Sequence, residues 1–84
     1  MTSRGEIPLK RVWEMLERCA PGHTVVTRVH YHLVRYRERS YPALPLGKHG
    51  KRENPPIEIG HIRKMVRQLE IDPDCARQAL PQLG

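Results

Sequence analysis

Apolar residues change their spacing twice along this 84-residue chain, and this change limits the folds that the chain can adopt. Two segments carry apolar residues at helical spacing, and a segment rich in β-branched and aromatic residues lies between them. The two helical sets are Leu9, Val12, Trp13 and Leu16, and Ile62, Met65, Val66 and Leu69. A chain of this length and order predicts one α+β domain over residues 1–84, in which a three-stranded antiparallel sheet is packed by helices on one face.

Proline, glycine and aspartate mark the ends of the predicted helices. Pro8 opens the first helix, because the first turn needs no backbone N–H donor, and Pro21-Gly22 ends it. Asp72 is a candidate N-cap for a short C-terminal helix with Pro73 in its first turn. This closing helix should carry Cys75, Ala76, Ala79 and Leu80.

The segment 23–39 has the composition of a β-strand, but it exceeds the usual length of one. We therefore expect a tight turn near His30-Tyr31 that divides it into a hairpin. No glycine marks this turn, and a slip of one residue would exchange the two faces of the strand. Which histidine points to solvent thus stays open. A third strand is expected over 41–46. Proline cannot donate a backbone hydrogen bond, so Pro42 and Pro45 must lie on an edge strand or at the ends of the strand.

Basic residues outnumber acidic ones, which favours a partner that carries negative charge. Lys plus Arg number 15 against 9 for Asp plus Glu, and the formal net charge is +6. No acidic residue lies within 60–68, so the polar side of the second helix is strongly basic. We predict RNA as the partner, although a basic surface that is merely solvated is the alternative. The predicted RNA-contacting residues are Arg28, Arg35, Lys48, His49, Lys51, Arg52, Arg63, Lys64 and Arg67.

The two cysteines, Cys19 and Cys75, are too few and too scattered for the disulfide framework of a small secreted domain. We expect both to be small apolar side chains on helix faces. The first residues contain no apolar core of a signal sequence, and no run approaches membrane-spanning length. The sequence therefore predicts a cytoplasmic protein that does not contact a membrane.

An ordered set of residues lies between the third predicted strand and the end of the second predicted helix. It begins with an apolar residue before proline, followed by a histidine, a proline-rich approach, a glycine and a basic helix. These places are taken by Leu44-Pro45, His49, Pro55-Pro56, Gly60, Ile62, Arg63 and Leu69-Glu70-Ile71. In this order they resemble the HicA-type mRNA interferase toxins, also described as the YcfA-like family. The resemblance extends from about Leu9 to Leu80.

The resemblance implies a dsRBD-like fold, with the order α-β-β-β-α of a double-stranded-RNA-binding domain. It also implies an endoribonuclease of a toxin-antitoxin pair, which cleaves mRNA and is neutralised by a protein antitoxin. Family members place an essential histidine after a glycine-containing turn at the start of the second strand. Here the stretch 28–34 contains no glycine, and a gapless match puts Tyr31 at that place, whereas a shift of one residue puts His32 there. We predict His32 as the catalytic residue, with His30 second.

A histidine in this position can cleave RNA without a metal ion. The neutral imidazole takes the proton of a 2′-hydroxyl, which attacks the adjacent phosphodiester, and nearby cations stabilise the charge on the phosphate. Three alternatives remain open. The first treats His30 and His32 as ordinary strand residues, and the second combines them with His23, His49 or His61 in a metal site. The third is a non-catalytic RNA- or protein-binding module with the same fold. Apart from the metal ion of the second alternative, we expect no cofactor.

Overall fold

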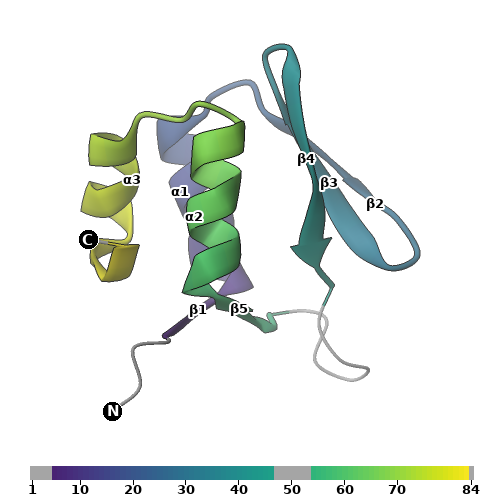
Figure 1. Cartoon of the computed structure of the whole chain (residues 1–84), viewed down its shortest axis with the longest axis horizontal. Coiled ribbons are helices and arrows are strands. Elements are labelled where there is room, and N and C mark those ends of the chain that lie inside the picture. The colour runs from purple at the N-terminus through teal and green to yellow at the C-terminus, as the bar shows by residue number, and fades with distance from the viewer. Residues whose placement is uncertain (1–4, 47–53, 84) are drawn as a thin grey trace.

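The computed structural model describes residues 5–46 and 54–83. The elements, in chain order, are β1 (Glu6–Pro8), α1 (Leu9–Cys19), β2 (Thr24–Thr27), β3 (Tyr31–Tyr36), β4 (Arg39–Pro45), β5 (Pro56–Glu58), α2 (Ile59–Gln68), α3 (Pro73–Ala79) and a closing 3₁₀ turn (Pro81–Leu83). Figure 1 shows the β2–β3–β4 sheet on one side of α1 and α2, with α3 on their other side. The predicted α+β order is confirmed, including the short C-terminal helix.

The predicted hairpin turn lies between β2 and β3, at Val29-His30. Thr27 pairs with His32 across the two strands, and the Arg28 backbone N–H donates to the Tyr31 carbonyl at 2.8 Å. The turn residues do not adopt a positive φ, so the turn forms without a glycine. The second turn, between β3 and β4, does require the left-handed region, and Arg37 adopts it with a φ of 58°.

A β-bulge in β4 accommodates the proline that the sequence places within this strand. His32 pairs with Leu44 and Val34 pairs with Tyr41, so Pro42 and Ala43 together lie opposite one residue of β3. A bulge leaves a residue out of the hydrogen-bonded ladder, and proline, which lacks a backbone N–H, is tolerated there. The third strand is therefore an edge strand, as predicted, and it begins two residues earlier than expected.

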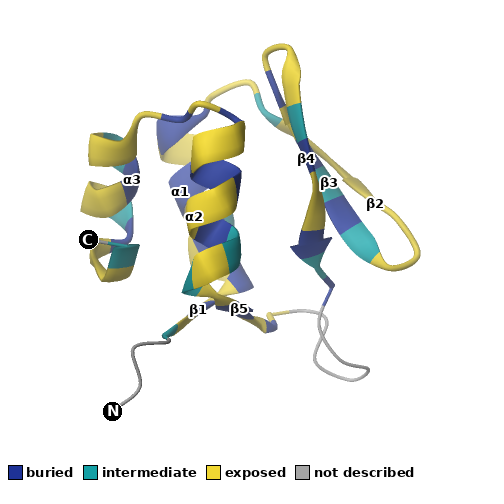
Figure 2. Cartoon of the chain, in the orientation of Figure 1, coloured by how far each residue is buried: buried dark blue, intermediate teal, exposed yellow. Residues whose placement is uncertain are grey.

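The core lies between the sheet and the helices. Along β3, His32, Val34 and Tyr36 are buried, whereas the residues between them are more exposed, so one face of the sheet is covered (Figure 2). Seven of the eight predicted core residues of the two helices are buried. The eighth, Trp13, is half-buried and packs against the edge of the core.

A two-stranded ribbon that the sequence analysis did not predict joins the starts of α1 and α2. Strands β1 and β5 are antiparallel, and their central residues, Ile7 and Ile57, are fully buried. Each strand leads directly into a helix, so the ribbon fixes the N-terminal ends of both helices side by side (Figure 1). Each strand has only three residues, and Pro8 pairs with Pro56, so the sequence gives no strand periodicity to detect.

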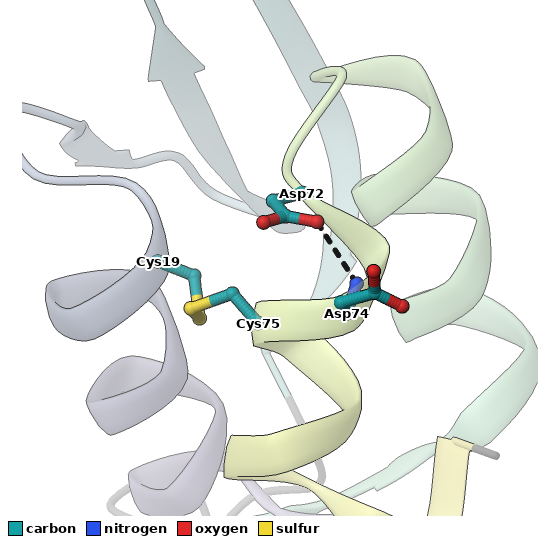
Figure 3. The surroundings of a disulfide bond; sticks show 4 residues. All are labelled: Cys19, Asp72, Asp74 and Cys75. Carbon is teal, nitrogen blue, oxygen red and sulfur yellow. Dashed lines mark hydrogen bonds between the residues drawn. A yellow bond between two sulfur atoms is a disulfide. The ribbon is translucent and has the colours of Figure 1, made fainter.

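The prediction that Cys19 and Cys75 are unpaired apolar side chains was wrong, because the two form a disulfide. Cys19 ends α1 and Cys75 lies in the first turn of α3, with their Cα atoms 5.7 Å apart (Figure 3). The predicted Asp72 cap holds the start of α3 in place, because its carboxylate accepts from the Asp74 backbone N–H at 3.0 Å. The separation of 56 residues gave no indication of this proximity, which the helix packing creates.

The disulfide also bears on the predicted location of the protein. Disulfides persist in oxidising compartments and are rare in the reducing cytosol. The Cys19–Cys75 bond therefore does not support the predicted cytoplasmic location, which stays a prediction. In the part of the chain that the structure describes, no helix combines the length and the apolar character needed to cross a bilayer.

Replacing both cysteines with alanine should loosen α3 before the rest of the fold. The loop closed by the disulfide is long, and the loss of its constraint should cost up to about 4 kcal/mol of unfolding free energy. A helix of seven residues is not stable in isolation, so the effect should be local first. Amide exchange measures this directly, and the Leu80 N–H, bonded to Ala76, should exchange faster while the Leu69 N–H, bonded to Met65, changes much less.

The control for this prediction is the redox dependence of the parent protein. A dithiol reductant should accelerate exchange of the Leu80 amide in the parent and leave the double alanine variant unchanged. Equal acceleration of the Leu69 and Leu80 amides would contradict a local role for the disulfide.

Candidate functional site

The second helix presents a basic face to solvent. Arg63, Lys64 and Arg67 are exposed, while Ile62 and Met65 turn toward the core. None of the salt bridges found among the described residues involves these three cations, and α2 itself contains no acidic residue. Three exposed positive charges on adjacent turns of a helix that has no acidic residue of its own form a surface that favours phosphate groups. We call Arg63, Lys64 and Arg67 the α2 basic face.

A groove of about 560 Å³ lies beside this face, between α2 and α3. Its lining includes Arg63, Arg67 and Arg77, but also Glu70 and Asp72. Two carboxylates offset most of the charge of the three arginines, so the groove is a poorer site for phosphate than the outer surface of α2. The Arg63 guanidinium donates to the Leu83 carbonyl at 3.1 Å, which holds this side chain at the rim of the groove.

The other predicted RNA-contacting residues do not gather on the α2 basic face. Arg28 follows β2 at the hairpin turn, and Arg35 lies on the face of the sheet opposite the helices. The sheet therefore separates Arg35 from α2. The remaining predicted contacts, Lys48, His49, Lys51 and Arg52, lie outside the described residues.

The two predicted catalytic histidines have opposite environments. His30 is exposed in the turn between β2 and β3. His32 is only 9% exposed and faces the helices. Its Nδ1 hydrogen-bonds with the Thr27 hydroxyl at 3.0 Å, and its ring meets Trp13 edge to face, with the ring centroids 5.2 Å apart. Its Nε2 is buried and has no hydrogen-bond partner among the described residues.

Burial lowers the pKa of His32, because a charged imidazolium is poorly solvated beside Trp13. A lowered pKa keeps the imidazole neutral at pH 7, which is the form that a general base needs. A base must also come within about 3 Å of the proton that it abstracts. In this conformation Nε2 is closed to solvent, so His32 reaches a 2′-hydroxyl only if the residues that cover it move.

The structure shows a histidine interaction that the sequence pattern did not reveal. Tyr41 of β4 is buried, and its hydroxyl hydrogen-bonds with Nδ1 of His61 of α2 at 3.1 Å. Burial raises the pKa of Tyr41, so its hydroxyl stays protonated at neutral pH. His61 is half-buried. Gln68 makes a second link to the sheet by donating to the Ser40 carbonyl at 2.8 Å.

The described histidines lie in separate environments and do not form a group of metal ligands. His23 bonds through Nδ1 to the Ala20 carbonyl at 2.9 Å, where it helps to close the end of α1. His30, His32 and His61 have the separate environments given above. Within residues 5–46 and 54–83, no three His, Cys, Asp or Glu side chains are grouped so that they could hold a metal ion. His49, another candidate ligand, lies outside these ranges.

His32 should make the stability of the protein depend on pH. Its pKa is lowered in the folded state and takes the ordinary value of about 6.5 in the unfolded chain, so the unfolded state binds the proton more tightly. Stability is therefore full above about pH 6.5 and is lost as the pH falls from there toward the folded pKa. Urea unfolding at several pH values should show this loss in the parent and a smaller loss in His32→Leu.

His30→Leu is the matched control, because it removes a histidine that is exposed in the folded state. Its pH dependence should follow that of the parent. A His32→Leu variant that loses as much stability on acidification as the parent would contradict the role given to the buried imidazole.

The chain was compared with protein families, curated proteins and solved structures, and a function can be assigned only from its fold and surface. No family model, curated protein or solved structure matches the chain. The resemblance to the HicA-type toxins thus rests on the residues from Leu44 to Ile71 and stays a prediction.

Proposed function

We propose that this protein binds RNA through the α2 basic face. The observation that carries the proposal is the set of three exposed cations, none of them in a salt bridge found among the described residues, on a helix without acidic residues. Phosphate contacts supply most of the affinity of nucleic-acid-binding proteins, and they need such a surface rather than a deep cavity. The α-β-β-β-α order and the net charge of +6 agree with this class of partner.

The α2 basic face is also held rigidly, which favours binding without a large ordering cost. The helix is fixed to β4 by the Tyr41–His61 and Gln68–Ser40 hydrogen bonds, and its start is fixed by the β1–β5 ribbon. Side chains that project from a fixed helix lose only their own rotamer freedom on binding.

Replacing Lys64 and Arg67 with glutamine should weaken RNA binding and flatten its dependence on salt. Each phosphate contact releases counterions, so the loss of two contacts should reduce the slope of log K against log salt by about 1.4 for single-stranded RNA. Fluorescence anisotropy with labelled RNA at several salt concentrations measures both effects.

The matched control removes two exposed charges from another helix, in Lys10→Gln/Arg18→Gln. This variant has the same net charge as Lys64→Gln/Arg67→Gln but keeps the α2 basic face. Equal weakening in both variants would indicate a general charge effect and would contradict a site on α2.

We further propose, on the resemblance, that the protein is an endoribonuclease of the HicA type that acts on mRNA and is neutralised by a protein antitoxin. His32 is the proposed general base, and the cations near the RNA stabilise the developing phosphate charge. In this proposal the residues that cover His32 must move before Nε2 can reach the substrate. The second candidate is a non-catalytic RNA- or protein-binding module, and the burial of the His32 Nε2 favours it.

Cleavage of single-stranded RNA in the presence of EDTA distinguishes the two candidates. If the enzyme proposal is correct, His32→Ala should reduce the rate by about 10²- to 10⁴-fold, as expected for the loss of a general base, and His30→Ala should reduce it less. The rate of the parent should rise with pH as the imidazole loses its proton. Because burial lowers the pKa of His32, this rise should lie below the range of an ordinary histidine.

RNA binding is measured on the same samples, so the two proposals can fail separately. A parent protein that binds RNA and cleaves none, under metal-free conditions, is the binding module. A His32→Ala variant that cleaves as fast as the parent would remove His32 as the base, whatever the affinity for RNA.

A further inference from the structure

The two edges of the β2–β3–β4 sheet are protected very differently. The β4 edge carries Pro42 and Pro45, contains a bulge, and is bonded to α2 through Tyr41 and Ser40. The β2 edge has none of these features. All four residues of β2 are exposed, and the strand, Thr-Val-Val-Thr, contains neither a charge nor a proline (Figure 2). Proteins commonly protect sheet edges with charges, prolines or bulges, since an open edge can pair with another strand.

The register identifies the backbone groups that this edge presents. The Arg28 N–H donates to the Tyr31 carbonyl, so Arg28 and Tyr31 form a hydrogen-bonded pair of the antiparallel ladder. Hydrogen-bonded and non-hydrogen-bonded pairs alternate, which directs the groups of Val26 and Thr24 toward β3 as well. The N–H and C=O groups of Val25 and Thr27 therefore point outward, away from the sheet.

We infer that the β2 edge pairs with the β2 edge of a second copy of this chain. In this dimer the two β2 strands run antiparallel, and the two three-stranded sheets join into one sheet of six strands. Val25 and Thr27 of each copy supply the hydrogen bonds that the edge leaves unmade. Val25 and Val26, which are 37% and 39% exposed, bury more of their side chains at the joint.

A second copy suits this edge because antiparallel pairing of the two β2 strands places no like charges opposite each other. A two-fold axis perpendicular to the sheet places one residue opposite itself, either Val25 or Val26. In the first register Arg28 lies opposite Gly22 of the other copy, and in the second it lies opposite Thr24. In both registers, Arg28 of one copy therefore does not lie opposite Arg28 of the other, which limits repulsion between chains with a net charge of +6.

The interface between the two β2 strands is small, so the dimer is weak. A pair of four-residue strands buries far less than the roughly 1,200 Å² of a stable protein interface. We therefore expect a monomer–dimer equilibrium that depends on concentration in the micromolar to millimolar range, and no permanent dimer.

Sedimentation equilibrium of the RNA-free protein tests the inference, with Val25→Pro as the blocking variant. Proline removes the outward N–H of Val25 and leaves the β2–β3 hydrogen bonds in place. Because the dimer is symmetric, two hydrogen bonds are lost, and the dissociation constant should rise about tenfold or more. In the parent, exchange of the Val25 and Thr27 amides should slow as the concentration rises.

Two further variants keep the test decisive if Val25→Pro perturbs the fold. Val26→Lys adds a charge on the exposed face of β2 beside the two-fold axis, and it should raise the dissociation constant about fivefold. Val29→Lys is the control, because Val29 is 76% exposed but lies outside the strand, and it should leave the dimer unchanged. A parent that stays monomeric at millimolar concentration would overturn the inference. A dimer that resists Val26→Lys, or that Val29→Lys disrupts equally, would place the contact elsewhere and would also overturn it.

Discussion

The packing of α1 and α2 against one face of the β2–β3–β4 sheet is the constraint on which the other features depend. Both helices place their apolar side chains on this face, and Val34 and Tyr36 of β3 meet them from the sheet. Because this burial fixes the rotation of α2 about its axis, it also fixes which side of α2 faces solvent. The exposed cations of α2 and the buried position of His32 are thus two consequences of the same packing.

The N-terminal ribbon and the disulfide reinforce this packing at its two ends. The β1–β5 ribbon joins the starts of α1 and α2, whereas the Cys19–Cys75 bond joins the end of α1 to α3 (Figures 1 and 3). A small domain has a limited apolar core, so such links contribute a large share of its stability. The basic surface of α2 consequently lies on a helix whose start is fixed by the ribbon.

The burial of His32 bears on the proposed RNA cleavage and not on the proposed RNA binding. Cations can contact phosphate groups from the protein surface, and a helix can expose them without loss of core packing. A general base must reach its substrate, whereas Nε2 of His32 is buried and its Nδ1 is bonded to Thr27. An imidazole kept neutral by burial has the right protonation state but lacks access. Any activity at His32 therefore depends on a movement that exposes its Nε2.

The sequence by itself determined the order of the helices and of the three strands of the main sheet, the helix-facing core and the α2 basic face, because the spacing of apolar residues within one helix or strand is a local property. The Asp72 cap was readable for the same reason. Only the tertiary structure decided which face of β3 is buried, since a slip of one residue in the hairpin exchanges His32 with its neighbours. It alone paired Cys19 with Cys75 and Tyr41 with His61, because contacts between distant segments depend on how the elements pack and leave no periodic trace in the sequence.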